Sequence, residues 1–398
     1  MRGATPKLIR PRSAALAALA VVLSGCGSRQ EYPPEMPFPA RADRLVIRMP
    51  TQEPAGFGQP GKLDEELAGL DAIGGKTFDP ADAPPGQRQP LETFLADTFG
   101  TPAAPRIAGD TEVSASADRL GLTSDRLAEG GKLFRRHCVQ CHGMTGDGRG
   151  PTGLWINPHP RDFRRGAFKF VSTGDGGKPR RSDLARTIRD GLKGTAMPAF
   201  ALLPEDQRDL LASYVIFLSL RGQVEFQTLA AIATEGESEN GVDGDPAAFA
   251  AIRLKTALRD WEKAQSAPGA PPDPLPNDDA SWQAPERFDS VRRGYELFTA
   301  PGGTSCISCH QDFGRKATYR YDVWGTVVRP ADLTGTNLKS GNGPDVLFHR
   351  VRGGIQPSGM PAHPTLTDAQ VWDLVHFVRA LPYARELPPD VRAKVYPE

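Results

Sequence analysis

The sequence predicts an all-α protein with two similar helical domains. The main observation is an internal repeat: each half contains a helix, a C-x-x-C-H motif, a long irregular segment, a Met-Pro pair and a closing helix, in that order. A chain of 398 residues is long enough for two or three domains. Its 38 prolines and 42 glycines indicate that much of the remaining chain forms extended connections.

Residues 1–25 have the pattern of a bacterial export signal. Basic residues precede an apolar run, Ala14 to Leu23, that is shorter than the roughly 20 residues needed to cross a bilayer. The next residues, Ser24-Gly25-Cys26, complete a segment that resembles a lipobox, in which the cysteine is lipidated and becomes the mature N-terminus. The alternative is an ordinary signal peptide with an incidental cysteine. We expect lipidation at Cys26 and a lipid anchor on a bacterial membrane, facing the periplasm.

The segment 26–115 is rich in proline and glycine and shows little periodic hydrophobicity. This composition predicts an extended arm that wraps the first domain or stands away from it. The alternative is an arm that docks onto a specific partner.

The first domain is expected over residues 116–222. Ser124 can cap a helix over Asp125–His137, and a second helix over Pro204–Arg221 carries a stripe of apolar residues. These two helices enclose the first C-x-x-C-H motif and the first Met-Pro pair.

The second domain, residues 286–398, repeats this plan with helices over Asp289–Thr299 and Thr367–Leu381. Between the domains, residues 223–285 contain 11 acidic and four basic side chains. We predict an acidic linker with one helix over Pro246–Gln265, and no third redox domain.

The C-x-x-C-H motif is the attachment signature of c-type haem. Two thiols add to the two vinyl groups of the porphyrin, and the adjacent histidine becomes an axial ligand of the iron. The spacing suits this chemistry because one helical turn presents both sulfur atoms along one edge of the ring. The predicted haem-binding residues are Cys138, Cys141 and His142 in the first domain and Cys306, Cys309 and His310 in the second. The sequence therefore predicts two covalently bound haem c groups.

Met197 and Met360 are the predicted second axial ligands. Each lies in a Met-Pro-Ala sequence some fifty residues after its haem motif, and a thioether ligand raises the reduction potential of haem iron. An isolated methionine is more often a core residue, but the repeated position favours ligation. His363, three residues after Met360, is an alternative ligand for the second iron.

Each half resembles a class I cytochrome c domain, a small all-α fold around one haem. In that family the helix before C-x-x-C-H crosses the helix after the methionine at a glycine and aromatic contact. Gly131 and Phe134 match one side of this contact in the first domain, with Tyr214 opposite. In the second domain the matching residues are Gly294 and Phe298, with Trp372 or Phe377 opposite.

The resemblance also implies a partner for the axial histidine. In the family, a proline carbonyl after the haem motif accepts the Nδ1 proton of this histidine and fixes the ring. Pro151 is the matching candidate for His142, whereas the residues after His310 contain no nearby proline. Trp155 and Trp324, each between a haem motif and its methionine, are expected to pack against haem.

The predicted function is electron transfer by a membrane-anchored di-haem protein with redox protein partners, such as a membrane oxidase, a reductase or a dehydrogenase. The alternatives are a di-haem enzyme (a peroxidase or a sulfur-compound oxidoreductase), which needs an open axial position, and a cytochrome subunit of a larger respiratory complex. Equal numbers of basic and acidic residues, 48 each, argue against nucleic-acid binding.

Residues 160–195 form a locally basic segment, with ten basic and four acidic side chains. We expect this segment to be either a docking face for an acidic partner or a solvated basic loop.

Overall fold

The computed structural model describes residues 31–174, 176–234, 242, 244–267, 271–272, 285–302, 305–316 and 318–397. The predicted export signal and Cys26 lie outside these residues. The described chain is mostly helical, and its strands form two small antiparallel pairs. The predicted all-α class is therefore confirmed.

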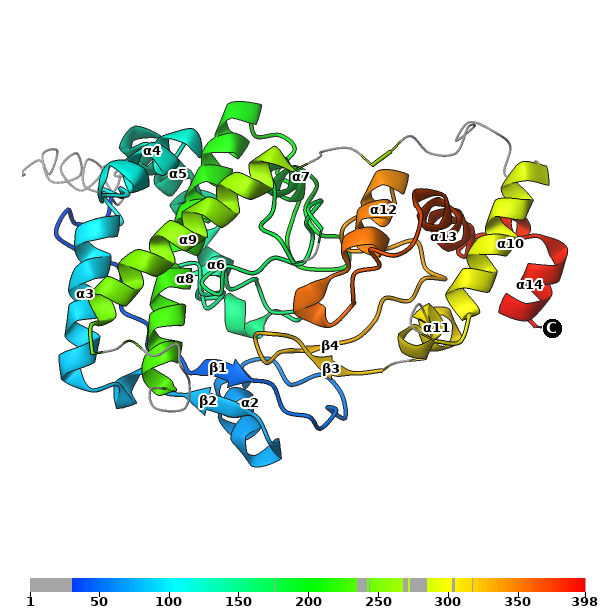
Figure 1. Cartoon of the computed structure of the whole chain (residues 1–398), viewed down its shortest axis with the longest axis horizontal. Helices are drawn as coiled ribbons and strands as arrows, with labels where there is room; N and C mark the ends of the chain where they lie inside the picture. Colours follow the sequence, from blue (N-terminus) through cyan, green and yellow to red (C-terminus); the bar gives the residue numbers. More distant parts are fainter. Residues whose placement is uncertain are drawn as a thin grey trace, which may run out of the picture.

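The α-helices are α2 (Leu63–Gly69), α3 (Pro85–Phe99), α4 (Thr111–Arg119), α5 (Ser124–His137), α6 (Val139–His142), α7 (Arg181–Asp190), α8 (Glu205–Ala233), α9 (Pro246–Ser266), α10 (Pro285–Thr299), α11 (Cys306–Cys309), α12 (Pro344–Gly353), α13 (Asp368–Ala380) and α14 (Pro389–Val395). Short 3-10 helices are η2 (Leu70–Ile73), η3 (Pro80–Asp82), η4 (Gly153–Trp155), η5 (Gln311–Gly314), η6 (Gln356–Ser358) and η7 (Ala384–Glu386). Strand β1 (Leu45–Arg48) pairs with β2 (Lys76–Phe78), and β3 (Arg320–Tyr321) pairs with β4 (Val327–Val328). Figure 1 shows α3, α5, α8 and α9 together on one side of the molecule and α10, α13 and α14 on the other.

In the first domain, α5 crosses α8 at a contact that requires glycine. A Cβ atom on Gly130 would lie 2.5 Å from the carbonyl oxygen of Leu210, and one on Gly131 would lie 3.0 Å from the Tyr214 ring. Phe134 packs against Tyr214 with ring centroids 5.3 Å apart. This is the helix crossing that the cytochrome c resemblance implies.

The second domain repeats the crossing with α10 and α13. A Cβ atom on Gly294 would lie 2.1 Å from the carbonyl oxygen of Asp373. Phe298 contacts Phe377 edge to face at 5.4 Å, whereas Trp372 packs on Phe348 at 4.8 Å. The aromatic residue at the crossing is therefore Phe377.

The N-terminal segment differs from the extended arm that its composition predicts. Leu91, Leu95 and Phe99 lie at four-residue spacing on α3 and are buried in the core of the first domain, and Phe99 contacts Phe217 of α8 at 5.8 Å. Pro85 begins the helix, where proline loses no hydrogen bond. Proline-rich composition therefore coexists here with a packed helix.

The segment after residue 222 also packs onto the first domain. Helix α8 continues to Ala233, and the predicted helix over Pro246–Gln265 is observed as α9. Trp261 of α9 is fully buried and contacts Phe168 at 5.8 Å. The segment is therefore charged overall, but one apolar face of α9 is buried in the core of the first domain.

Candidate haem sites

The cysteines of each motif lie on one short helical turn. Helix α6 follows Cys138 and contains Cys141, and α11 runs from Cys306 to Cys309. All four are free thiols. Burial raises the pKa of Cys138 to about 12 and that of Cys306 to about 11. In the haem-free chain these two groups are protonated thiols at neutral pH.

The two motif histidines are held in the same way. The Nδ1 atom of His142 lies 3.1 Å from the carbonyl oxygen of Arg161, and the Nδ1 atom of His310 lies 3.1 Å from that of Ala331. A backbone carbonyl can only accept, so each ring carries its proton on Nδ1 and keeps the Nε2 lone pair for a metal. Pro151, the predicted acceptor for His142, is exposed and does not have this role.

Burial keeps both imidazoles in the form that binds iron. It lowers the pKa of His142 to about 4, against a smaller opposite effect of the hydrogen bond to Arg161, and it lowers the pKa of His310. Neutral imidazole is the state of histidine that coordinates metals. Phe163 stacks on the His142 ring at 4.7 Å and restricts its rotation.

A second repeated motif, missed in the sequence, supplies the two acceptors. Pro160-Arg161-Asp162 and Pro330-Ala331-Asp332 share a Pro-x-Asp pattern, and the middle residue gives the carbonyl. The aspartates shape both loops alike: Asp162 accepts from the backbone amide of residue 164 at 2.8 Å, and Asp332 accepts from that of residue 334 at 2.9 Å. The repeat of Pro-x-Asp after each haem motif is the signal that identifies these loops.

The loops that carry the two methionines also share their geometry. Gly191 and Gly354 end α7 and α12 with φ of 65° and 68°, six residues before the methionine in each case. A Cβ atom at these positions would lie 2.7 Å from the Met197 carbonyl oxygen and 2.5 Å from the Met360 carbonyl oxygen. Glycine is therefore needed for the backbone to turn back and place the methionine beside the cavity.

All eight predicted haem residues line one cavity of about 1140 Å³. Two thiols, an imidazole with a free Nε2 and a thioether are the donor set of a c-type haem, and each domain brings one such set to this cavity. His363 also lines the cavity. Trp155 is 70% exposed and Trp324 lies outside the residues that line the cavity, so neither packs there as predicted.

The basic segment 160–195 is largely used inside the molecule. Arg164 is 3% exposed and binds both carboxylate oxygens of Asp43, at 2.7 and 2.8 Å. Lys169 binds Asp322 of the second domain at 2.9 Å. Arg164 and Lys169 therefore join the N-terminal segment and the second domain to the first domain, and they belong neither to a docking face nor to a solvated basic loop, the two alternatives predicted for this segment.

Comparison with known proteins finds similarity to cytochrome c domains in both halves of the chain. The model of the family "Cytochrome C oxidase, cbb3-type, subunit III" matches twice, over residues 125–215 and 289–378. No curated protein matches the chain. Among solved structures, a chain of the Kuenenia stuttgartiensis reducing HAO-like protein complex Kustc0457/Kustc0458 is similar, with 24% sequence identity, a TM-score of 0.43 and coverage of 64% of this chain and 95% of that chain. The two family matches each contain one of the crossings and one of the motifs described above. The two matches are consistent with two cytochrome c domains, one around each motif.

Proposed function

We propose that this protein is a membrane-anchored electron carrier that holds two haem c groups, each with histidine and methionine as axial ligands. The observation that carries the proposal is the single cavity lined by both complete donor sets. Haem iron with both axial positions filled by protein changes oxidation state without binding a substrate. The alternative of a di-haem enzyme requires one of these positions to be open.

Each residue has a definite task in this proposal. Cys138 and Cys141 would hold the first haem by thioether bonds, with His142 and Met197 as axial ligands. In the second domain, Cys306 and Cys309 would form the thioether bonds, and His310 and Met360 would be the axial ligands. The hydrogen bonds to the Arg161 and Ala331 carbonyls fix the tautomer of each histidine and increase its donation to iron.

We also propose that Cys26 is lipidated and attaches the protein to a bacterial membrane on the periplasmic side. Among the described residues, no helix is both long and apolar enough to cross a membrane. The lipobox-like sequence supports the anchor, and haem c attachment outside the cytoplasm is consistent with export. The partners would be redox proteins, such as a membrane oxidase, a reductase or a dehydrogenase, and the same anchor would suit a cytochrome subunit of a larger complex.

The axial ligands can be tested by optical spectroscopy and redox titration. We expect two low-spin ferric haems with the weak red absorption band of methionine–iron coordination. Met197→Ala and Met360→Ala should each lower the potential of one haem, because each removes a thioether ligand. A large high-spin fraction with rapid turnover of hydrogen peroxide would favour the enzyme, and unchanged potentials in both variants would refute the axial assignment.

The anchor is tested separately. Wild-type protein should sediment with membranes and partition into detergent, whereas Cys26→Ser should be found in the soluble periplasmic fraction. Release of the wild type without detergent would contradict lipidation and leave the haem assignment unaffected.

A further inference from the structure

A turn of the second domain lies against the first haem site. Residues 322–326 connect β3 to β4, and Asp322 organises this turn by accepting from the backbone amides of Trp324 and Thr326 at 3.1 and 3.0 Å. The Asp322 side chain is fully buried, and it binds Lys169 of the first domain at 2.9 Å. The turn is therefore fixed to the first domain by a buried ion pair.

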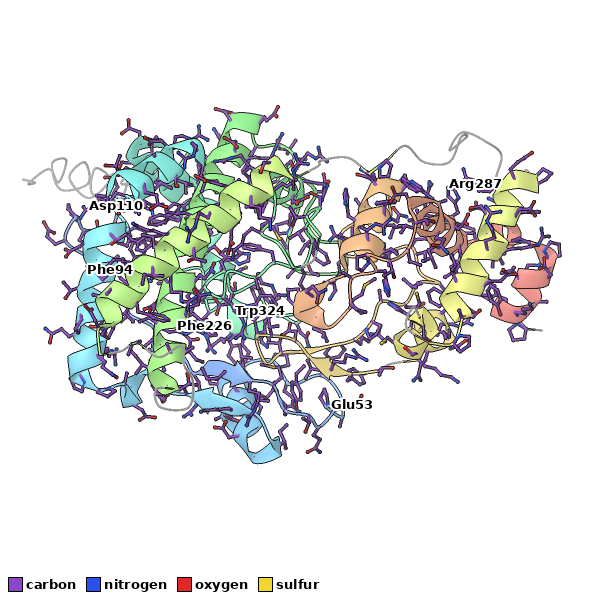
Figure 2. All side chains as sticks on the ribbon, in the orientation of Figure 1. Glu53, Phe94, Asp110, Phe226, Arg287 and Trp324 are labelled. Atoms are coloured by element: carbon purple, nitrogen blue, oxygen red, sulfur yellow. The ribbon has the colours of Figure 1, made fainter. Side chains whose placement is uncertain are left out.

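Trp324 contacts the loop whose Arg161 carbonyl binds His142. Its indole Nε1 donates to the carbonyl oxygen of Asp162 at 3.0 Å, and the Arg161 guanidinium lies 3.6 Å from the centre of its ring. Trp324 is 8% exposed, and Figure 2 shows it at the centre of the molecule, between the helices of the two halves.

Two successive carbonyls of this loop thus have different partners. The Arg161 carbonyl accepts the Nδ1 proton of His142, and the next carbonyl, of Asp162, accepts the Trp324 indole proton. The side chain of Asp162 is in turn bound by Arg164, which also binds Asp43. Trp324 therefore binds the carbonyl next to the one that orients His142.

We propose that Trp324 and Asp322 are positioning residues for the first haem, so that docking of the second domain sets the first haem's reduction potential. This inference rests on the proposed role of His142 as an axial ligand. A strong hydrogen bond from Nδ1 increases the basicity of the imidazole and stabilises ferric iron. Loosening the loop should weaken this bond and raise the potential of the first haem.

The same turn also contacts the loop that carries Met360, because the Val323 amide donates to the Pro357 carbonyl oxygen at 3.0 Å. The acceptor of His310 is Ala331, whose methyl side chain cannot form the stacked contact that Arg161 forms with Trp324. Trp324 and Asp322 themselves bind groups of the first domain, so substitutions at these two residues should shift the potential of the first haem more than that of the second.

Trp324→Phe is the sharpest test because it keeps an aromatic ring and removes the Nε1 donor. The full-length protein would be titrated with both haems bound, and the first haem identified as the titration step that disappears in a Cys138→Ser/Cys141→Ser variant. We expect the potential of the first haem to rise, its EPR g values to shift with the orientation of the axial histidine, and the potential of the second haem to change less than that of the first. Asp322→Asn should act in the same direction, since it weakens the ion pair with Lys169 while an amide oxygen can still accept from the turn.

Trp155→Phe is the matched control, because Trp155 is 70% exposed and belongs to the loop after the first haem motif. This variant should leave both potentials unchanged. The inference is overturned if Trp324→Phe and Asp322→Asn both bind two haems and leave the potential and g values of the first haem at their wild-type values. It is also overturned if both haems shift equally, which indicates a general loosening of the fold. A wild-type protein with fewer than two titrating haems would instead refute the proposed function.

Discussion

Gly191 offers a direct test of how the chain places Met197. Its φ of 65° and ψ of −166° belong to a region that is essentially restricted to glycine. Any other residue in this conformation is strained, which lowers the stability of the folded protein by about 1–3 kcal/mol. An alanine Cβ would also lie 2.7 Å from the Met197 carbonyl oxygen and 2.7 Å from the Pro198 carbonyl carbon. Both neighbours are backbone atoms, so the methionine loop must move, and overpacking of this kind adds about 1–3 kcal/mol.

We therefore expect Gly191→Ala to lower the free energy of unfolding by roughly 2–6 kcal/mol and to weaken the red methionine–iron band of the first haem. Gly194→Ala is the control in the same loop: its φ is 69°, but a Cβ there meets no atom within 4 Å, so only the backbone strain remains. Chemical denaturation and optical spectra of both variants measure the difference. Equal destabilisation by the two substitutions, with the band intact in both, would refute the proposed role of the glycine.

Three further predictions concern the buried contacts. Asp43→Ala leaves Arg164, which is 3% exposed, without one of its two carboxylates, and should destabilise the protein by about 3–5 kcal/mol in chemical denaturation; a loss below 1 kcal/mol would contradict this. Burial alone would raise the pKa of Asp43, but Arg41 and Arg164 lower it below the usual value. Its stabilising contribution is therefore complete above about pH 4 and is lost as the pH falls further. The wild type should lose stability between about pH 4 and 2 more steeply than Asp43→Asn, and parallel curves would oppose the assignment. Gly294→Ala would place a Cβ 2.1 Å from the Asp373 carbonyl oxygen and should reduce the yield of protein with the second haem, as measured by the haem absorbance per chain; a normal yield would show that the crossing tolerates a wider separation.

Local patterns in the sequence predicted the parts of the structure that depend on neighbouring residues. The helix predicted over Asp125–His137 is observed as α5, and the predicted closing helix of the second domain is observed as α13. The attachment motif is also local, since one turn of helix brings Cys138 and Cys141 to one side. Such features follow from spacing along the chain, so a single sequence is sufficient to find them.

Features that depend on distant residues were not predictable in this way. The acceptor of His142 is a backbone carbonyl 19 residues later; the repeated Pro-x-Asp pattern marks its loop, but only the structure shows which carbonyl accepts. Proline content suggested an extended arm, but the apolar face of α3 finds partners on α8 and α9 that only the tertiary fold provides. The contact of Trp324 with the first domain likewise has no signal in the sequence, because an isolated tryptophan does not identify its partner.

The account depends most on the claim that each C-x-x-C-H motif carries its own haem in the shared cavity. The direct measurement is the mass of the intact exported protein, compared with that of the Cys138→Ser/Cys141→Ser variant. We expect the wild type to carry the mass of two covalently attached haems and the variant to carry one. A wild-type mass with one haem or none would contradict the account.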